Sequence, residues 1–191
     1  MQRLVHRLPF VLPMLVLLGS SPLARANAQA APAAPAPTLP AANPADVASV
    51  DAIIAALYDV ISGAAGQARN WDRMRSLFIP GARLIPTGQR PDGTTGHRVL
   101  TVEDYITQSG PQLERNGFFE REIGHKTDTF GNVTHVFSAY DSKRTAQDEK
   151  PFSRGINSIQ LLNDGKRWYV VTIFWDSERP NNQIPEKYLA K

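Results

Sequence analysis

The chain contains no cysteine among its 191 residues. This absence excludes a disulfide framework, a thiolate nucleophile, cysteine-based metal sites and a lipidated cysteine. Histidine is also scarce, with four in the chain, and none forms an H-x-H motif or a pair at helical spacing, so the sequence predicts no metal site. No glycine-rich segment lies between a strand and a helix in the arrangement that holds phosphates, and no nucleotide or other cofactor is predicted.

Without the first thirty residues, the chain has no excess of basic over acidic residues. The chain has 21 Lys and Arg against 18 Asp and Glu, and three of the arginines, Arg3, Arg7 and Arg25, lie in the first thirty residues. The remaining 18 basic and 18 acidic residues balance and are interspersed. This balance excludes nucleic acid as a partner and gives no attraction to an anionic membrane.

No apolar run is long enough for a membrane-spanning helix. The longest, residues 8–19, has about a dozen residues where about 20 are needed, and it follows a basic start and precedes Ala28-Gln29-Ala30. These features predict a signal peptide over residues 1–30, cleaved after Ala30, and hence a periplasmic or secreted protein. Residues 31–45 are rich in Pro and Ala and predict a disordered tether, followed by one domain over 46–180 and a C-terminal tail over 181–191.

Within this domain, helical periodicity comes first and strand-forming sequence follows. Helices are predicted over 46–61, 71–78 and 101–115, with a brief strand at 82–85 and a loop at 86–96. Strands are predicted over 118–130 and 133–144 around Gly131-Asn132, and then over 156–162 and 168–175 around Asn163-Asp164-Gly165. Helices followed by an antiparallel meander predict an α+β domain whose sheet curves around the helices.

Two segments, FGNVTHVFSAY and GINSIQLLNDGKRWYVVTIFWDSERP, together with this order of elements, resemble the nuclear transport factor 2-like superfamily, which includes the SnoaL-like and ketosteroid isomerase-like proteins. Within it the chain is similar to small exported bacterial members of undefined activity. The resemblance implies a cone-shaped α+β fold with one apolar cavity, and a homodimer formed through the convex face of the sheet. It also implies that Asn157, Trp175 and Tyr58 occupy cavity positions of a ketosteroid isomerase. The general base does not carry over, because Pro86 or Thr87 takes its place.

Strand register predicts which other side chains share the cavity. A two-residue Gly131-Asn132 turn places His125 opposite Ser138, with Thr127, Val136 and Tyr140 on the same face, whereas His135 faces the other side. Counting from the second turn places Asn157 opposite Val171. The candidate ligand contacts are Tyr58, Trp71, Ser138, Tyr140, Asn157 and Trp175, with core packing as the alternative for Trp71 and for the tyrosines.

Two functional hypotheses follow. The first is a domain that binds a small aromatic or polycyclic molecule without catalysis. The alternative is a cofactor-independent lyase, isomerase or cyclase in which His125 is the acid/base and Tyr58 and Asn157 donate hydrogen bonds to a developing oxyanion. A third possibility is a dimerising module. Glu120 and Glu122 are interpreted as cross-strand ion-pair partners, and Asp176, Glu178 and Arg179 as a solvated strand end or a clamp on the tail.

Overall fold

The structure, a computed structural model, describes residues 39–189. The predicted signal peptide and residues 31–38 of the predicted tether lie outside the described residues. Residues 39–45 are described, and the 3-10 helix Pro44–Val47 begins within them, capped by the Asn43 side chain. No helix within 39–189 has the length and hydropathy needed to cross a membrane.

Residues 39–189 contain three α-helices, as the periodicity predicts. Helix α1 spans Val50–Ile61, α2 spans Trp71–Leu77 and α3 spans Val102–Asn116. The start of α1 differs from the predicted residue 46, because Ser49 caps the helix through the backbone N–H of Ala52. Thr101 caps α3 as predicted, in a reciprocal capping box with Asp104.

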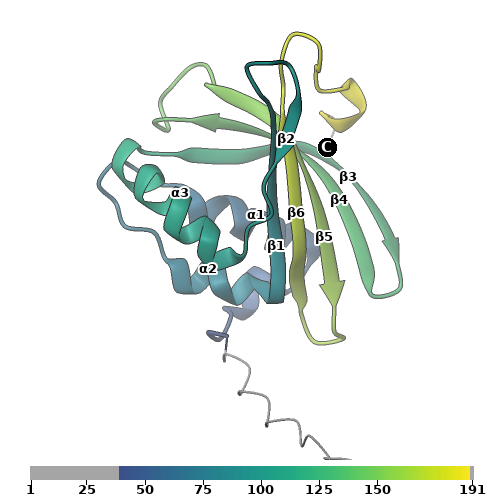
Figure 1. Cartoon of the computed structure of the whole chain (residues 1–191). Helices are drawn as coiled ribbons and strands as arrows, with labels where there is room; N and C mark the ends of the chain where they lie inside the picture. The colour runs from purple at the N-terminus through teal and green to yellow at the C-terminus, as the bar shows by residue number, and fades with distance from the viewer. Residues whose placement is uncertain (1–38, 190–191) are drawn as a thin grey trace, which may run out of the picture. The chain divides into compact units, whose positions relative to one another are not determined.

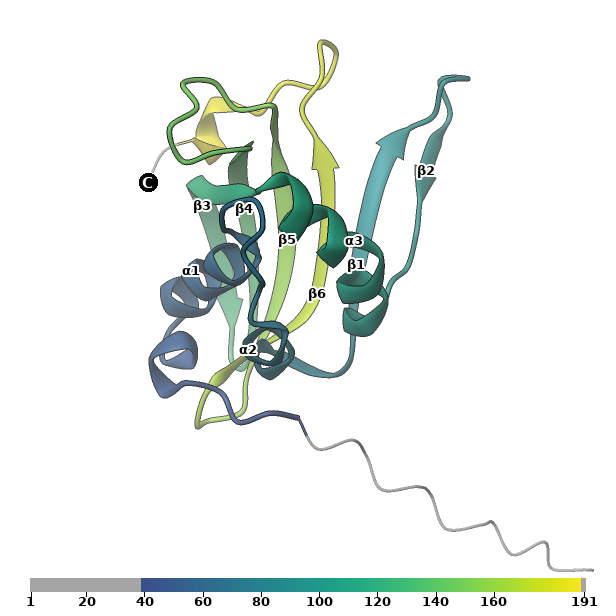
Figure 2. The ribbon, with the colours of Figure 1, turned by 90° about the vertical axis from the view of Figure 1, so that its left-hand side faces the viewer.

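In the described part of the chain, six strands form one sheet in the order β2-β1-β6-β5-β4-β3. Their bounds are Phe78–Gln89 for β1, Thr95–His97 for β2, Phe119–Phe130 for β3, Val133–Lys143 for β4, Ser153–Asn163 for β5 and Trp168–Ser177 for β6. The predicted loop over 86–96 is wrong. Strand β1 continues into it as far as Gln89, and the chain then turns back into β2, forming a hairpin that projects from the edge of the sheet (Figure 2).

Three of the neighbouring strand pairs form the predicted antiparallel meander, whereas β1 runs parallel to β6. The sheet is curved, and the helices lie against its concave face (Figure 1). This arrangement confirms the predicted α+β class and is the cone-shaped architecture that the resemblance to the nuclear transport factor 2-like superfamily implies. The core lies between the two layers, where Ile53, Leu77, Phe78, Val136 and Ile159 are all almost fully buried.

The predicted register is correct in the β3–β4 hairpin and wrong in the β5–β6 hairpin. Between β3 and β4, His125 lies opposite Ser138 and Asp128 lies opposite His135, as predicted. Between β5 and β6, Asn157 lies opposite Trp175 and not opposite Val171. The turn is longer than the predicted three residues, since Asn163 pairs with Trp168, and a further irregularity follows Gln160. The partner of Asn157 thus shifts from Val171 to Trp175, which is an even number of residues along β6. An even shift keeps the same faces of the two strands together, so the Asn157 side chain still faces the helices.

Candidate functional site

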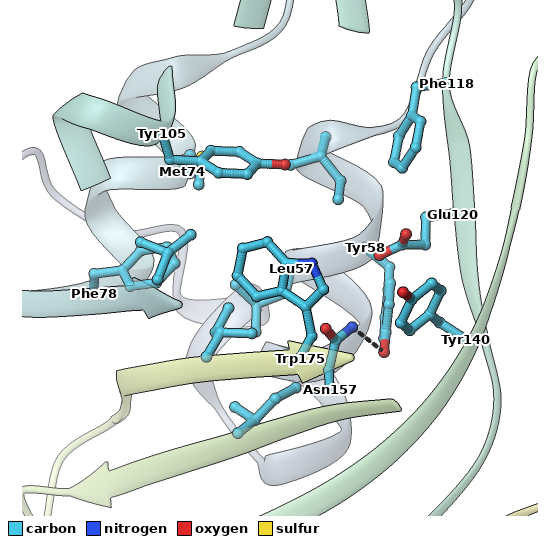
Figure 3. Close-up of a pocket in the computed structure, with 14 residues that line it drawn as sticks. Leu57, Tyr58, Met74, Phe78, Tyr105, Phe118, Glu120, Tyr140, Asn157 and Trp175 are labelled. Atoms are coloured by element: carbon cyan, nitrogen blue, oxygen red, sulfur yellow. Dashed lines mark hydrogen bonds between the residues drawn. The ribbon is translucent and has the colours of Figure 1, made fainter. Parts of the chain in front are cut away.

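A cavity of about 130 Å³ lies between the helices and the concave face of the sheet (Figure 3). Its walls are mainly aliphatic and aromatic and come from all three helices and from five strands or strand ends. The side chains that bring polar atoms to it are Tyr58, Tyr105, Glu120, Tyr140, Asn157 and Trp175. An apolar cavity with a few convergent polar groups is the usual form of a small-molecule site.

Among the described residues, Glu120 is the only Asp, Glu, His, Lys or Arg that lines this cavity. Burial raises the pKa of its carboxyl to about 7, even though hydrogen bonds from Ser142 and Asn157 act in the opposite direction. The Ser142 hydroxyl donates to Glu120 Oε2 at 2.7 Å. A carboxyl group with such a pKa exchanges its proton near neutral pH, which is what a general acid or base requires.

A bulge in β3 brings this carboxyl into the cavity. Glu122 pairs with Tyr140 and Gly124 pairs with Ala139, so Ile123 is an extra residue without a partner. One extra residue reverses which side chains face the concave side. The interpretation of Glu120 and Glu122 as cross-strand ion-pair partners is therefore wrong, because both side chains turn toward the helices and neither pairs with an arginine or lysine in the described structure.

Tyr58, Ser138 and Glu122 form a chain of hydrogen bonds beside the cavity. Ser138 Oγ donates to Glu122 Oε1 at 2.6 Å, and Tyr58 Oη lies 2.7 Å from Ser138 Oγ. Since the serine proton goes to the carboxylate, the Tyr58 hydroxyl donates to Ser138. Asn157 Nδ2 then donates to Tyr58 Oη at 3.1 Å. Burial raises the pKa of Tyr58, so this hydroxyl keeps its proton. The proton points toward Ser138 and away from the cavity.

Two other groups remain available to a ligand. The structure gives neither the Tyr105 hydroxyl nor Trp175 Nε1 a hydrogen-bond partner within residues 39–189, yet both residues line the cavity. Every fully buried polar side-chain atom of the described residues does have a partner, so these two donors must reach open space. Figure 3 shows the Tyr105 hydroxyl directed toward the centre of the cavity. Burial raises the pKa of Tyr105, which keeps its hydroxyl protonated as a donor.

The remaining predicted site residues lie elsewhere. His125 is not part of the cavity wall, and its Nδ1 lies 3.0 Å from Glu122 Oε2. Ser138 is fully buried behind Tyr58 and does not line the cavity either. Trp71 packs against Gly110 of α3 and donates from Nε1 to Glu114 Oε1 at 3.1 Å. The structure thus places Tyr58, Tyr140, Asn157 and Trp175 together, and places Trp71 in the contact between helices.

A second, more polar cleft of about 510 Å³ lies between α1 and the outer strands. Tyr58 and Glu120 line both this cleft and the apolar cavity. The pair therefore forms a common wall, and Glu120 is accessible from a side that a ligand in the cavity does not occupy. Within residues 39–189, no cluster of three or more His, Asp or Glu side chains has the arrangement needed to hold a metal ion.

The described part of the chain is thus an α+β domain with three helices on a curved sheet and one small cavity that contains a carboxyl group. No protein-family model and no curated protein matches the sequence. Among solved structures, a protein of unknown function from Methylobacillus flagellatus, described as NTF2-like, is similar with 16% identity over 69% of this chain and 95% of its own, at a TM-score of 0.44.

An NTF2-like protein of unknown function from Shewanella baltica is similar with 16% identity over 69% of this chain and 98% of its own, at a TM-score of 0.39. The Kfla4162 protein from Kribbella flavida shares 8% identity over 58% of this chain and 78% of its own, at a TM-score of 0.42. Likenesses at this level carry no information on activity.

Proposed function

We propose that this domain binds a small, uncharged ring compound and transfers a proton on it without a cofactor, with Glu120 as the acid/base. The observation that carries the proposal is the Glu120 carboxyl, which lies in an apolar cavity and has a pKa raised to about 7 by burial. Carboxyl groups are rarely left in apolar surroundings without a cation, and perturbed pKa values concentrate at functional sites. The class of activity is that of a cofactor-independent isomerase or lyase.

The size of the cavity restricts the ligand. A dry engineered cavity of about 150 Å³ accommodates benzene, and this cavity has about 130 Å³. A single ring therefore fits the volume. A polycyclic ligand, which the sequence also allowed, does not fit unless the walls move. A charged ligand would lose its hydration among mainly aliphatic and aromatic side chains.

The polar groups restrict its chemistry further. A ring ketone can accept hydrogen bonds from the Tyr105 hydroxyl and Trp175 Nε1, which have no partner within the described residues. The ionised Glu120 can then remove a proton from the carbon next to the carbonyl. The electron pair of the C–H bond forms the C=C bond of an enolate, and the π pair of the carbonyl moves to its oxygen. In a ketone with a β,γ double bond, returning the proton to the γ carbon completes an isomerisation, and in a ketone with a leaving group on the β carbon, expelling that group with its electron pair completes an elimination. Hydrogen-bond donors placed where negative charge develops stabilise such a transition state.

This proposal assigns the acid/base role to Glu120 in place of His125. The Nδ1 atom of His125 is held by Glu122, and the residue is not part of the cavity wall. Tyr58 is also not proposed as a donor to the substrate, since its proton is directed to Ser138.

Binding without turnover is the second candidate. This candidate is supported by the lining of the cavity, in which no second Asp, Glu, His, Lys or Arg accompanies Glu120 to share the proton transfer. In that case Glu120 would act only as a hydrogen-bonding partner for a ligand hydroxyl or carbonyl group.

The test is deuterium exchange, which needs no knowledge of the natural substrate. Cyclopentanone, cyclohexanone and their enones are incubated with the protein in D₂O, and the loss of the α-proton signals is followed by NMR. We expect exchange above the buffer rate that rises with pH through about 7 and is lost in Glu120→Gln. The matched control is Glu149→Gln, which makes the same change at an exposed loop position. Binding of these compounds with no exchange would favour the second candidate, and neither binding nor exchange would refute both.

We also propose that the chain is exported and that its signal peptide is removed after Ala30. The basic start, the apolar run and the A-x-A sequence support this proposal. N-terminal sequencing of the protein recovered from a bacterial periplasm should begin at Ala31. A protein that retains Met1 in the cytoplasm would contradict it.

A further inference from the structure

The β1–β2 hairpin extends the concave face of the sheet beyond the cavity. Leu84 of β1 lies in the cavity wall, and side chains two residues apart in a strand face the same side. Pro86, Gly88 and Arg90 therefore lie on the same face as Leu84, in a row that leads away from the cavity. Strand β1 lies beside α3, so this row is on the side of the sheet that carries the helices (Figure 2).

The same face of the hairpin carries a second arginine from β2. Gly88 pairs with Gly96, and the backbone N–H of Arg98 donates to the carbonyl of Pro86 at 3.2 Å. Because directly paired residues share a face of the sheet, Gly96 and Arg98 stand beside Gly88 and Pro86. The two paired glycines form a surface without side chains, which we call the glycine floor, and Arg90 and Arg98 lie at its two ends.

The Arg90 guanidinium group lies over one half of the glycine floor. A Cβ atom added to Gly96 would lie 2.9 Å from Arg90 Cζ, whereas a Cβ atom added to Gly88 would meet nothing within 4 Å. The missing side chain at Gly96 is what allows the guanidinium to approach the strand, and the space over Gly88 beside it is open. At this place a pocket of about 370 Å³ is lined by Pro86, Thr87, Gly88, Arg90, Gly96, His97 and Arg98.

Neither arginine of the pocket forms an ion pair with a carboxylate among residues 39–189. The Arg98 guanidinium donates to the neutral amide oxygen of Gln108 on α3 at 2.9 Å, which orients it without offsetting its charge. Arg90 has only long contacts of 3.4 Å to threonine oxygens of the same hairpin. Asp92, in the turn of the hairpin, accepts from the backbone N–H and the hydroxyl of Thr94 instead. Both positive charges are therefore available to a ligand.

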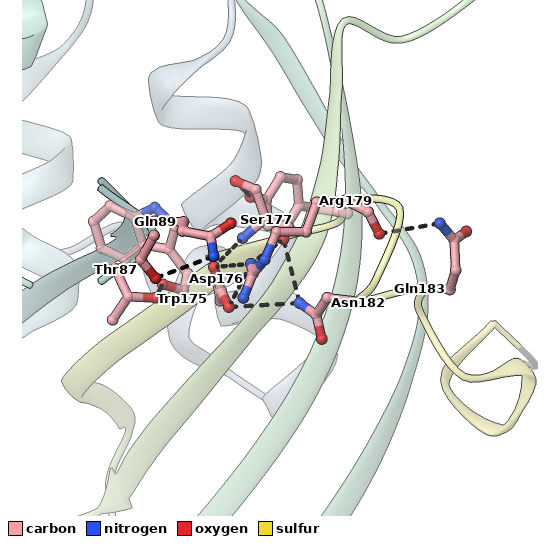
Figure 4. Close-up of polar contacts among 10 residues, drawn as sticks. Thr87, Gln89, Trp175, Asp176, Ser177, Arg179, Asn182 and Gln183 are labelled. Carbon is pink, nitrogen blue, oxygen red and sulfur yellow. Dashed lines mark hydrogen bonds and ion pairs between the residues drawn. The ribbon is translucent and has the colours of Figure 1, made fainter. Parts of the chain in front are cut away.

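The arginines beside the end of β6 differ in this respect. Arg179 donates to both carboxylate oxygens of Asp176 at 2.9 Å (Figure 4), and Arg154 donates to Glu178 at 3.0 Å. These ion pairs form the clamp that was one of the two interpretations of this strand end, with Arg154 as an additional member. Strand β6 runs parallel to β1, so the clamp and the hairpin lie at the same end of the sheet. At that end, the clamp arginines are neutralised by carboxylates of the chain, and the two hairpin arginines are not.

We propose that the glycine floor, Arg90 and Arg98 bind the phosphate group of a small phosphate monoester. Such a group has a charge of about −2 at pH 8, which balances two guanidinium groups, and its terminal oxygens accept hydrogen bonds from both. A carboxylate has one negative charge and is satisfied by a single guanidinium. The open space over Gly88 holds the phosphate between the two side chains. Since basic and acidic residues balance after residue 30, the chain has no excess of charge for a nucleic acid. This inference does not depend on the proposed function of the apolar cavity.

The experiment is an NMR titration at pH 8 with methyl phosphate and, separately, with acetate, followed through the backbone amide signals of Gly88 and Gly96. Methyl phosphate should shift both signals, and acetate should bind at least about tenfold more weakly. Arg90→Gln and Arg98→Gln should each weaken methyl phosphate binding at least about tenfold, because each removes charged hydrogen-bond donors. Arg115→Gln is the matched control, since it makes the same change at an exposed position of α3 outside the pocket. It should change the affinity by no more than about twofold.

Gly88→Val tests the glycine floor separately from the charge. The added side chain fills the open space over the floor and removes neither arginine, so the affinity for methyl phosphate should fall at least about tenfold. Thr95→Val is its control, because Thr95 pairs with Gln89 on the opposite face of the same hairpin. It should leave the affinity within about twofold. Unchanged amide signals outside the hairpin show that each variant is folded.

Four results would overturn the proposal. A loss of affinity in Arg115→Gln as large as that in Arg90→Gln would show attraction by surface charge alone. A Gly88→Val protein that binds methyl phosphate like the wild type would show that the floor is not the site. Acetate that binds as tightly as methyl phosphate would contradict the class of ligand, and a titration that shifts neither glycine signal would show that no phosphate binds at the hairpin.

Discussion

Replacing Glu120 with glutamine should raise the free energy of unfolding at pH 8 and leave it nearly unchanged at pH 4.5. The reason is that the wild-type carboxyl must ionise in an apolar cavity as the pH rises, whereas glutamine stays neutral at both values. Glutamine has nearly the same shape and can still accept the hydrogen bond from Ser142. The substitution thus removes the ionisation of one group and little else.

The magnitude follows from the two pKa values of this group. In the folded chain burial raises the pKa of Glu120 to about 7, against an ordinary value of 4.5. Between these values the unfolded chain has released its proton and the folded chain still holds it, so the wild-type free energy of unfolding falls as the pH rises through this window. At about 1.4 kcal/mol per pKa unit, the difference between the two pKa values lowers the free energy of unfolding of the wild type by about 3 kcal/mol, whereas Glu120→Gln is not affected.

Urea denaturation at pH 4.5 and pH 8 measures this difference directly, and other titrating groups cancel in the comparison of the two proteins. For a domain of about 150 residues, the corresponding rise in melting temperature at pH 8 is about 6–12 °C. Glu149→Gln, at an exposed position, should change neither value measurably. An equal effect of Glu120→Gln at both pH values would show that the carboxyl is not neutral in the folded state at acidic pH, and would remove the basis of the proposed function.

Three further predictions concern individual side chains. Tyr105→Phe removes one hydrogen-bond donor and should weaken the binding of a ring ketone about three- to tenfold, as measured by calorimetry. Tyr58→Phe should change this affinity by no more than about twofold. A larger loss of affinity in Tyr58→Phe than in Tyr105→Phe would contradict the assignment of donors. Ser138→Ala should lower the free energy of unfolding by about 1–3 kcal/mol, because the Tyr58 hydroxyl loses its acceptor, and adding Tyr58→Phe should recover part of this loss in urea denaturation. Trp71→Phe removes the hydrogen bond to Glu114 and should cost about 1 kcal/mol of stability with unchanged ligand affinity; a loss of affinity as large as that of Tyr105→Phe would place Trp71 at the site after all.

Local sequence signals predicted those parts of the fold that depend on local geometry. The Gly131-Asn132 turn fixed the β3–β4 register correctly as far as Gly124, because a two-residue turn leaves one pairing that keeps the apolar face buried. The capping residue of α3 was also correct, since Thr101 satisfies backbone donors that belong to its own helix. In both cases the interacting residues are close neighbours in the chain.

Counting the β3–β4 register from the same turn does not place Glu120 in the cavity. Extending the β3–β4 register past Gly124 without a bulge turns Glu120 and Glu122 outward, whereas the extra residue Ile123 turns them inward. Gly124 was the available signal, because an isolated glycine in a strand pattern suggests a bulge or a close backbone approach. It marks both here, since the bulge lies next to it and the backbone of Tyr188 and Leu189 lies against it.

Tyr105 illustrates a different limit of prediction from sequence. It lies in the helix predicted over 101–115, and a tyrosine in this helix is compatible with a fully packed core residue and with a cavity wall. The distinction depends on whether Trp175 and the other walls leave space beside its hydroxyl. Those walls come from five strands or strand ends and from the two other helices, and their spacing is a property of the assembled layers.

The position of β6 between β1 and β5 has a consequence for the order in which the chain can fold. Phe78 of β1 pairs with Val170, and Pro86 pairs with Trp175, so the strand that joins the N-terminal half to the meander is the last strand in the chain. Until Trp168–Ser177 has been synthesised, β1 and β5 each have an open edge facing the other. Contacts at such separations in sequence form slowly because a long loop must close first. The sheet is therefore completed only after Trp168–Ser177 has been synthesised, and a nascent chain that lacks β6 has no strand to join β1 to β5.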